Sequence, residues 1–126
     1  MSSFSVQFRP AETPAGPARV LALTGELDAY TAPEFEAALE ACLADGVHRL
    51  VADGERLAYV SSAGLGVFMA FLEPCREDGG DLKIAALPPR VFEVFDLLGF
   101  PLLFDFAPTV EEALARFAPD DDARAA

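Results

Sequence analysis

The chain has 126 residues, of which 52% are hydrophobic, and its formal net charge at pH 7 is −12. This length and composition predict one domain with a buried core, and the charge argues against nucleic acid as a partner because it would repel a phosphate backbone. The longest nearly apolar stretch, residues 60–72, is too short to cross a membrane, and the N-terminus lacks the pattern of a signal peptide. We therefore expect a cytoplasmic protein without a membrane span.

The first expected elements are two strands and a helix. Phe4, Val6 and Phe8 alternate with polar residues, which predicts an edge strand with one buried face. Prolines and a glycine in residues 11–17 predict a loop, and the apolar run 20–23 predicts a more central strand. A helix should begin at Thr31, because residues 31–34 have the T-x-x-E form of a capping box, and it should end at Gly46.

The rest of the chain alternates strands and helices. Residues 50–52 predict a short buried strand, and apolar residues then recur at helical spacing from Ser62 until Gly79-Gly80. Pro74 lies inside this helix and should kink it or end it near Glu73. Four further elements are expected: a strand over 82–85, a helix over 88–98 closed by Gly99, a strand over 102–106, and a helix over 109–117 with a second capping box.

This order of elements predicts an α/β fold, a single domain with a mostly parallel mixed sheet of about five strands packed by about four helices. The domain is expected to span residues 1–118, and residues 119–126, which lack a large apolar side chain, to form a disordered acidic tail. Functional loops lie at the carboxyl ends of parallel strands, which points to residues 24–31 and 53–62.

Charged and sulfur-containing residues exclude several kinds of site. Cys42 and Cys75 have no CxxC spacing, so we expect reduced thiols in the core and no metal site or cofactor. Residues 20–48 contain acids but no Lys or Arg, which predicts a negatively charged surface. Such a surface either keeps a protein soluble or binds a basic partner. The acids of this segment are Glu26, Asp28, Glu34, Glu36, Glu40 and Asp45. Because no His, Lys or Cys accompanies the first two, we expect no enzyme activity.

Residues 59–66 (Tyr-Val-Ser-Ser-Ala-Gly-Leu-Gly) place two hydroxyls and two glycines where a strand-side loop enters a helix. Ser61 or Ser62 could simply cap the helix, a role typically worth ~1 kcal/mol, and the glycines permit close approach of another backbone. A nucleophilic serine lacks a base, since His48 is the only histidine and G-x-S-x-G is absent. A lone G-x-G is a weak signal for a phosphate-binding loop.

Four segments, in order, resemble the signatures of STAS domains, and most closely those of bacterial anti-sigma factor antagonists. They are residues 24–28 (Thr-Gly-Glu-Leu-Asp), 59–66, 79–82 (Gly-Gly-Asp-Leu) and 95–100 (Phe-Asp-Leu-Leu-Gly-Phe). The resemblance runs from about Phe4 to Phe117. It implies a STAS-like domain that binds an anti-sigma factor with serine kinase activity and so frees the sigma factor. A PP2C-type phosphatase is a further partner that the resemblance allows.

The resemblance also implies which residues carry the function. The phosphorylated serine of the family motif lies two residues before the glycine that opens Gly-Leu-Gly, which here makes it Ser62. The residue before it is often Asp in phosphorylated antagonists, and here it is Ser61; another departure is Gly54, which suggests a looser loop. The expected partner-binding residues are Asp28, Ser61, Ser62, Ala63, Gly64, Glu26, Tyr30 and Asp53.

Other interpretations of the function remain open at this point. Ser62 could be only a helix cap in a non-phosphorylated STAS adaptor subunit of a transport or stress-signalling complex. The Gly64–Gly66 loop could instead serve a nucleotide or small-molecule sensor. An apolar cluster formed by Leu98, Phe100, Leu102 and Leu103 is either core or a patch for a partner or a second copy.

Overall fold

In a computed structural model that describes residues 3–119, the chain forms one five-stranded sheet in which the strands follow the chain order. The strands are β1 (Phe4–Thr13), β2 (Gly16–Leu27), β3 (Arg49–Val60), β4 (Asp81–Ala85) and β5 (Phe106–Ala107). β1 is antiparallel to β2, and the other neighbours are parallel. The predicted mixed, mostly parallel sheet is therefore confirmed. The acidic tail expected over Asp120–Ala126 lies outside the described residues.

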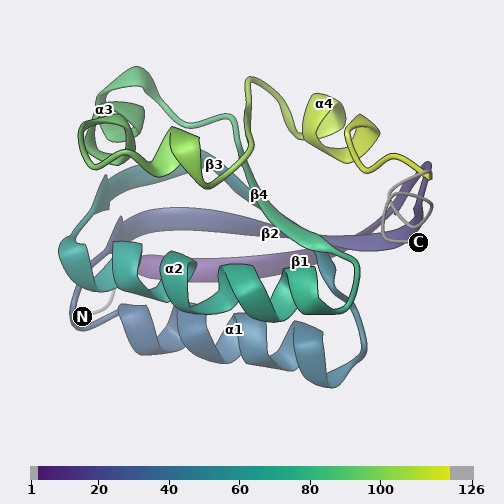
Figure 1. The fold of residues 1–126 in the computed structure, drawn as a ribbon. Coiled ribbons are helices and arrows are strands. Elements are labelled where there is room, and N and C mark those ends of the chain that lie inside the picture. Colours follow the sequence, from purple (N-terminus) through teal and green to yellow (C-terminus); the bar gives the residue numbers. More distant parts are fainter. Residues whose placement is uncertain (1–2, 120–126) are drawn as a thin grey trace.

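Four helices and one short 3-10 helix connect and cover the strands. They are α1 (Ala32–Ala44), α2 (Ser62–Glu77), α3 (Pro89–Leu97), η1 (Phe100–Leu102) and α4 (Val110–Ala115). α1 and α2 lie side by side below the sheet in Figure 1 and α4 lies above it, whereas α3 contributes Val91 and Phe95 to the same core as α1 and α2. No helix within residues 3–119 is long and apolar enough to span a bilayer.

Strand alternation divides the buried side chains between the two faces of the sheet. On β3, Leu50 and Ala52 join the larger core with α1 and α2, whereas Val51 joins a smaller core with α4. Phe68 lies at the centre of the larger core, and its ring contacts those of Phe35 and Phe95 at centroid distances of 4.8 and 5.5 Å. Such aromatic pairs add about 0.5–1.5 kcal/mol each to the burial of their area.

The loop predicted over residues 11–17 is wrong, because β1 and β2 form a tight hairpin there. Pairing continues to Thr13 opposite Gly16, and the Thr13 hydroxyl donates a hydrogen bond of 2.7 Å to the Gly16 carbonyl. Pro10 is tolerated within β1 because β1 is an edge strand, as predicted from its alternation.

The early end predicted near Glu73 is also wrong, since α2 continues through Pro74 to Glu77. Proline removes one backbone hydrogen bond, but the turn that follows is held by tertiary contacts. Cys75 is fully buried, and the Arg76 guanidinium donates hydrogen bonds to Asp81 (2.9 Å) and to the Leu103 carbonyl (2.7 Å). These contacts compensate for the missing bond.

The last predicted strand lies later in the chain than expected. Gly99 adopts a left-handed conformation with φ +78°, and Pro101 then favours the 3-10 turn η1. The strand formed there, β5, consists of Phe106 and Ala107, which pair with Ile84 and Ala85 of β4. The apolar cluster of this region divides: Phe100 is buried, whereas Leu102 is 89% exposed. The capping threonine predicted for the final helix is confirmed, because Thr109 accepts a hydrogen bond from the Glu112 N–H.

Both cysteines should resist alkylation in the folded protein. Burial raises the pKa of Cys75 to about 12 and also raises that of Cys42, and only a thiolate attacks iodoacetamide. We expect slow labelling of the native chain at mildly alkaline pH and labelling of both thiols in denaturant, followed by mass spectrometry. A cysteine introduced at exposed Ala41 is the control that should react at once. Rapid labelling of native Cys42 and Cys75 would contradict the packing described.

Candidate functional site

The carboxyl ends of β2 and β3 bring the two predicted functional segments together. Leu27 pairs with Val60, and the Ser61 N–H donates a hydrogen bond of 2.9 Å to the Leu27 carbonyl. The turn after β2 and the first turn of α2 therefore lie at the same edge of the sheet. This edge carries Glu26 at the end of β2, Asp28 and Tyr30 in the turn that follows, and residues 61–64 at the start of α2.

The turn between β2 and α1 is built by Asp28 and Thr31. The Asp28 carboxylate accepts hydrogen bonds from the backbone N–H groups of Tyr30 (2.9 Å) and Thr31 (3.1 Å). The buried Thr31 hydroxyl accepts from the Asp28 N–H and donates to the Glu26 carbonyl, both at 2.8 Å. The hydroxyl thus faces the turn, and the capping box predicted at Thr31 is wrong. The result is a fixed turn from which Tyr30 projects with 93% of its surface exposed.

Loss of the Thr31 hydroxyl should destabilise the domain. Thr31→Val leaves the Glu26 carbonyl and the Asp28 N–H without their hydroxyl partner, at a cost of ~1–3 kcal/mol in the free energy of unfolding. Urea unfolding measures this change. Thr24→Val, which alters an exposed threonine of β2, is the control and should stay within about 0.5 kcal/mol of the parent. Equal stability of the two variants would show that the turn does not depend on Thr31.

The two serines at the start of α2 occupy different environments. Ser61 is the residue before the helix, but its Oγ is buried and has no hydrogen-bond partner among residues 3–119. Ser62 is the first helical residue and is exposed. Neither hydroxyl caps the helix, because no side-chain hydrogen bond reaches the free N–H groups of its first turn. The simple capping role considered for these serines is therefore absent from this structure.

The two glycines that follow also differ. A Cβ on Gly64 would lie 2.6 Å from Cγ of Leu27, so this helix start approaches β2 more closely than any other residue would allow. A Cβ on Gly66 would meet nothing within 4 Å, and Gly66 is exposed one turn after Ser62. Gly64 therefore packs the helix, whereas Gly66 leaves bare backbone on the surface next to Ser62.

Alanine at the two glycines should have opposite effects on stability. Gly64→Ala overpacks the contact with Leu27 and should lower the free energy of unfolding by ~1–3 kcal/mol. Gly66→Ala relieves the entropic penalty of glycine inside a helix and should raise the free energy of unfolding by ~0.5–1 kcal/mol. Chemical unfolding of both variants, each the control for the other, measures the difference. A neutral Gly64→Ala would mean that the close approach is not required.

Asp53 lies away from this site. The loop predicted over residues 53–62 is strand, because β3 continues to pair with β2 from Asp53 through Val60. At ~3.3 Å per residue, seven residues of strand put Asp53 about 20 Å from the start of α2. Gly54 is not part of a looser loop either: it is buried in β3, and the Leu87 side chain fills the space beside it.

Sequence reasoning missed the contribution of α3 to this end of the molecule. A hollow of about 400 Å³ lies between the ends of β2 and β3 and the start of α3. Its lining includes Val91 and Val94, with Glu26, Tyr59 and Arg90 around them. The spacing of the two valines indicated a helix face but could not show which part of that face reaches the site.

The charges around the helix start are mostly negative. α1 exposes Glu36 and Glu40, one turn apart, and Glu26 and Asp28 lie at the end of β2. The basic residue on the lining of the adjacent hollow is Arg90. An acidic surface beside an exposed serine at a helix N-terminus favours a partner with a basic surface.

Comparisons with known proteins agree with this fold. Residues 10–113 match the model of the STAS domain. BtrV of Bordetella bronchiseptica, named as an anti-sigma factor antagonist, is 38% identical over 98 residues, which cover 78% of this chain and 84% of that protein. The crystal structure of an anti-sigma factor antagonist from Mycobacterium paratuberculosis has a TM-score of 0.74 and 28% identity, covering 87% of this chain and 92% of that one. The phosphorylated form of SpoIIAA from Bacillus shares the fold, with a TM-score of 0.65, 24% identity, and coverage of 86% and 96%.

The chain belongs to the STAS domain family. Within that family its relatives are anti-sigma factor antagonists, which confirms the resemblance seen in the four sequence segments.

Proposed function

We propose that this protein is an anti-sigma factor antagonist that binds an anti-sigma factor with serine kinase activity and is switched off by phosphorylation of Ser62. The observation that carries the proposal is the exposed Ser62 hydroxyl at the first position of the sixteen-residue helix α2, beside the Asp28 turn. The antagonists named among its relatives support the role, and the fold that it shares with phosphorylated SpoIIAA supports the modification. The protein acts by binding and not as an enzyme.

The environments of the two serines favour Ser62 as the acceptor. A kinase must bring the hydroxyl to the γ-phosphate of ATP, and the Ser62 side chain is exposed for that approach. The Ser61 Oγ is buried, so its modification would require the start of α2 to open. Ser61 stands where related motifs often have Asp. Because that carboxylate is missing, the kinase would recognise the surface of the turn and the helix instead.

Phosphorylation at this position should leave the fold intact and weaken the complex. The added charge of about −1.5 to −2 lies at a helix N-terminus, where free N–H groups and the helix dipole stabilise it. A carboxylate of the partner about 6 Å away would repel it by roughly 4 to 6 kcal/mol at an effective dielectric of about 20, before screening. One third of that repulsion lowers affinity about tenfold. Binding is therefore the property that changes.

The partner surface that fits this site is basic opposite the acids of α1 and β2, places a carboxylate opposite Ser62, and carries an apolar side chain. Exposed acids on α1 and at the end of β2 favour cations opposite them. The hollow beside α3 offers Val91 and Val94 to an apolar group, and exposed Tyr30 supplies a large contact area. The same proposal places the protein in the cytoplasm, with a PP2C-type phosphatase to reverse the modification.

The alternative roles predict different partners. A non-phosphorylated STAS adaptor would keep the same complex whether or not Ser62 carries charge, and Ser61 in place of Asp is the observation that favours it. A nucleotide sensor built on Gly64–Gly66 has less support, because Gly64 is packed against Leu27 and serves the helix contact.

Ser62→Asp should abolish capture of the anti-sigma factor without unfolding the protein. Tagged parent, Ser62→Asp, Ser62→Ala and Ser61→Ala proteins are purified in parallel from the native host, and captured proteins are identified by mass spectrometry. We expect a protein with a kinase fold to accompany the parent and both alanine variants, and to be lost with Ser62→Asp. A calorimetric titration with that captured protein should show about tenfold weaker binding for Ser62→Asp than for the parent. In the same mass spectra the parent and Ser61→Ala proteins should carry a phosphate group, and the Ser62→Ala protein should not. Identical partners for the parent and Ser62→Asp would overturn the switch and favour the adaptor.

A further inference from the structure

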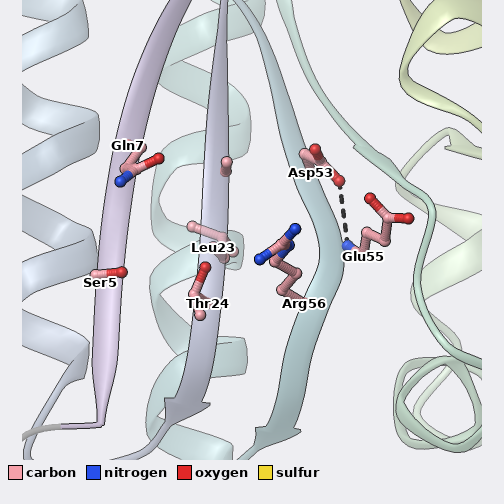
Figure 2. A pocket seen from close by; sticks show the side chains of 8 residues that line it. Ser5, Gln7, Leu23, Thr24, Asp53, Glu55 and Arg56 are labelled. Carbon is pink, nitrogen blue, oxygen red and sulfur yellow. Dashed lines mark hydrogen bonds between the residues drawn. The ribbon is translucent and has the colours of Figure 1, made fainter.

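The face of the sheet opposite α1 and α2 is only partly covered. α4 packs on Val20, Val51 and Ala85, which form the smaller core with it. Farther along the strands the same face is open and forms a groove of about 460 Å³ with walls from β1, β2 and β3 (Figure 2). The residues on its lining are mostly polar, and the groove lies apart from the Ser62 site.

An extra residue in β3 shapes this groove. Between the pairs Ala22–Asp53 and Thr24–Arg56, β2 advances by two residues and β3 by three. In a regular strand Glu55 and Arg56 would point to opposite faces, yet both line the groove. Bulges of this kind redirect side chains and are frequent next to binding sites.

The bulge is held in place from both sides of the sheet. The Asp53 carboxylate accepts a hydrogen bond of 3.1 Å from the Glu55 N–H, drawn in Figure 2. On the other side, Leu87 occupies the space beside Gly54, where an added Cβ would lie 2.3 Å from the Leu87 Cδ2 atom. A larger residue at position 54 would have to displace the end of the Leu87 side chain, so packing here favours glycine.

The guanidinium group of the groove is not used by the fold. Arg56 has no hydrogen-bond or ion-pair partner among residues 3–119, although Asp53 and Glu55 line the same groove. By contrast, Arg19 and Arg116 each pair with a carboxylate. A free guanidinium beside two carboxylates, in an acidic chain, is an arrangement that a ligand could complete.

The mixed charges define the chemical class of that ligand. A phosphate or a dicarboxylate would be repelled by Asp53 and Glu55, and a simple cation would leave the Arg56 guanidinium without a partner. A zwitterion provides a partner for the guanidinium and for the carboxylates. Its carboxylate can accept two hydrogen bonds from the planar Arg56 guanidinium, and its ammonium group can lie against Asp53 or Glu55. Gln7 and Thr24 add polar groups for the remaining atoms. The volume also lies within the usual range of small-molecule sites, ~300–1,000 Å³.

We propose that this groove binds a small zwitterion with a free carboxylate and a free ammonium group, an amino acid or a dipeptide. The proposal does not depend on the phosphorylation of Ser62 or on the identity of the protein partner.

Titration of the ¹⁵N-labelled protein with each of the common L-amino acids and with alanyl-alanine, monitored by NMR, tests this site. At least one probe should shift amide signals of residues 5–7, 22–24 and 53–56 while those of 61–66 stay unchanged. Arg56→Ala should weaken binding of that probe at least tenfold, and Arg9→Ala, which removes an exposed arginine of β1 outside the groove, should not change it. Spectra of the free variants verify that both remain folded.

Blocked forms of the same probe test the two halves of the recognition. N-acetylation removes the ammonium group and amidation removes the carboxylate, and each should weaken binding at least tenfold. The proposal is overturned if no probe shifts the groove signals at its highest soluble concentration, if the shifts survive Arg56→Ala, or if either blocked form binds as well as the free zwitterion.

Discussion

The close contact between the first turn of α2 and the end of β2 determines the geometry of the site. Gly64 lies against Leu27, and the Ser61 N–H is bonded to the carbonyl of that same leucine. Together the two contacts fix both the distance and the direction in which the helix leaves β3. Ser62 is exposed because its neighbours on either side are held: the backbone of Ser61 by the strand and Gly64 by the core. A flexible loop in place of this junction would present the serine in many orientations, at a cost in binding entropy.

The chain supports this junction with contacts farther along α2. Phe68, one turn beyond Gly64, joins rings from α1 and α3, so the helix is anchored from three directions. Arg76 and Cys75 hold its last turn. The fold thus places its strongest packing beneath the helix whose first residue is the proposed site of modification, and a charge added at that residue can act on a partner without disturbing the core.

The sequence was sufficient for features that local chemistry decides and insufficient for those that tertiary contacts decide. Apolar periodicity predicted the helices and most strands, and the pair of hydroxyls before Gly-Leu-Gly indicated the helix start. Pro74 was misjudged because contacts of Arg76 and Cys75, distant in sequence, retain the turn. The T-x-x-E pattern at Thr31 failed because the Asp28 turn competes for the same hydroxyl. Asp53-Gly54 has the signature of a turn, and only pairing with β2 and the packing of Leu87 convert it into a bulge.

The order of strands in the sheet has a consequence for how the chain folds. Each strand pairs with the one before it, so no segment has to wait for a distant part of the chain before it can add to the sheet. During synthesis from the N-terminus, the Ser62 helix can dock once β1, β2, α1 and β3 have emerged, before β5 and α4 exist. The junction that carries Ser62 is therefore assembled from the first two thirds of the chain, and the last third adds α3, with the hollow beside that junction, and α4 on the other face of the sheet.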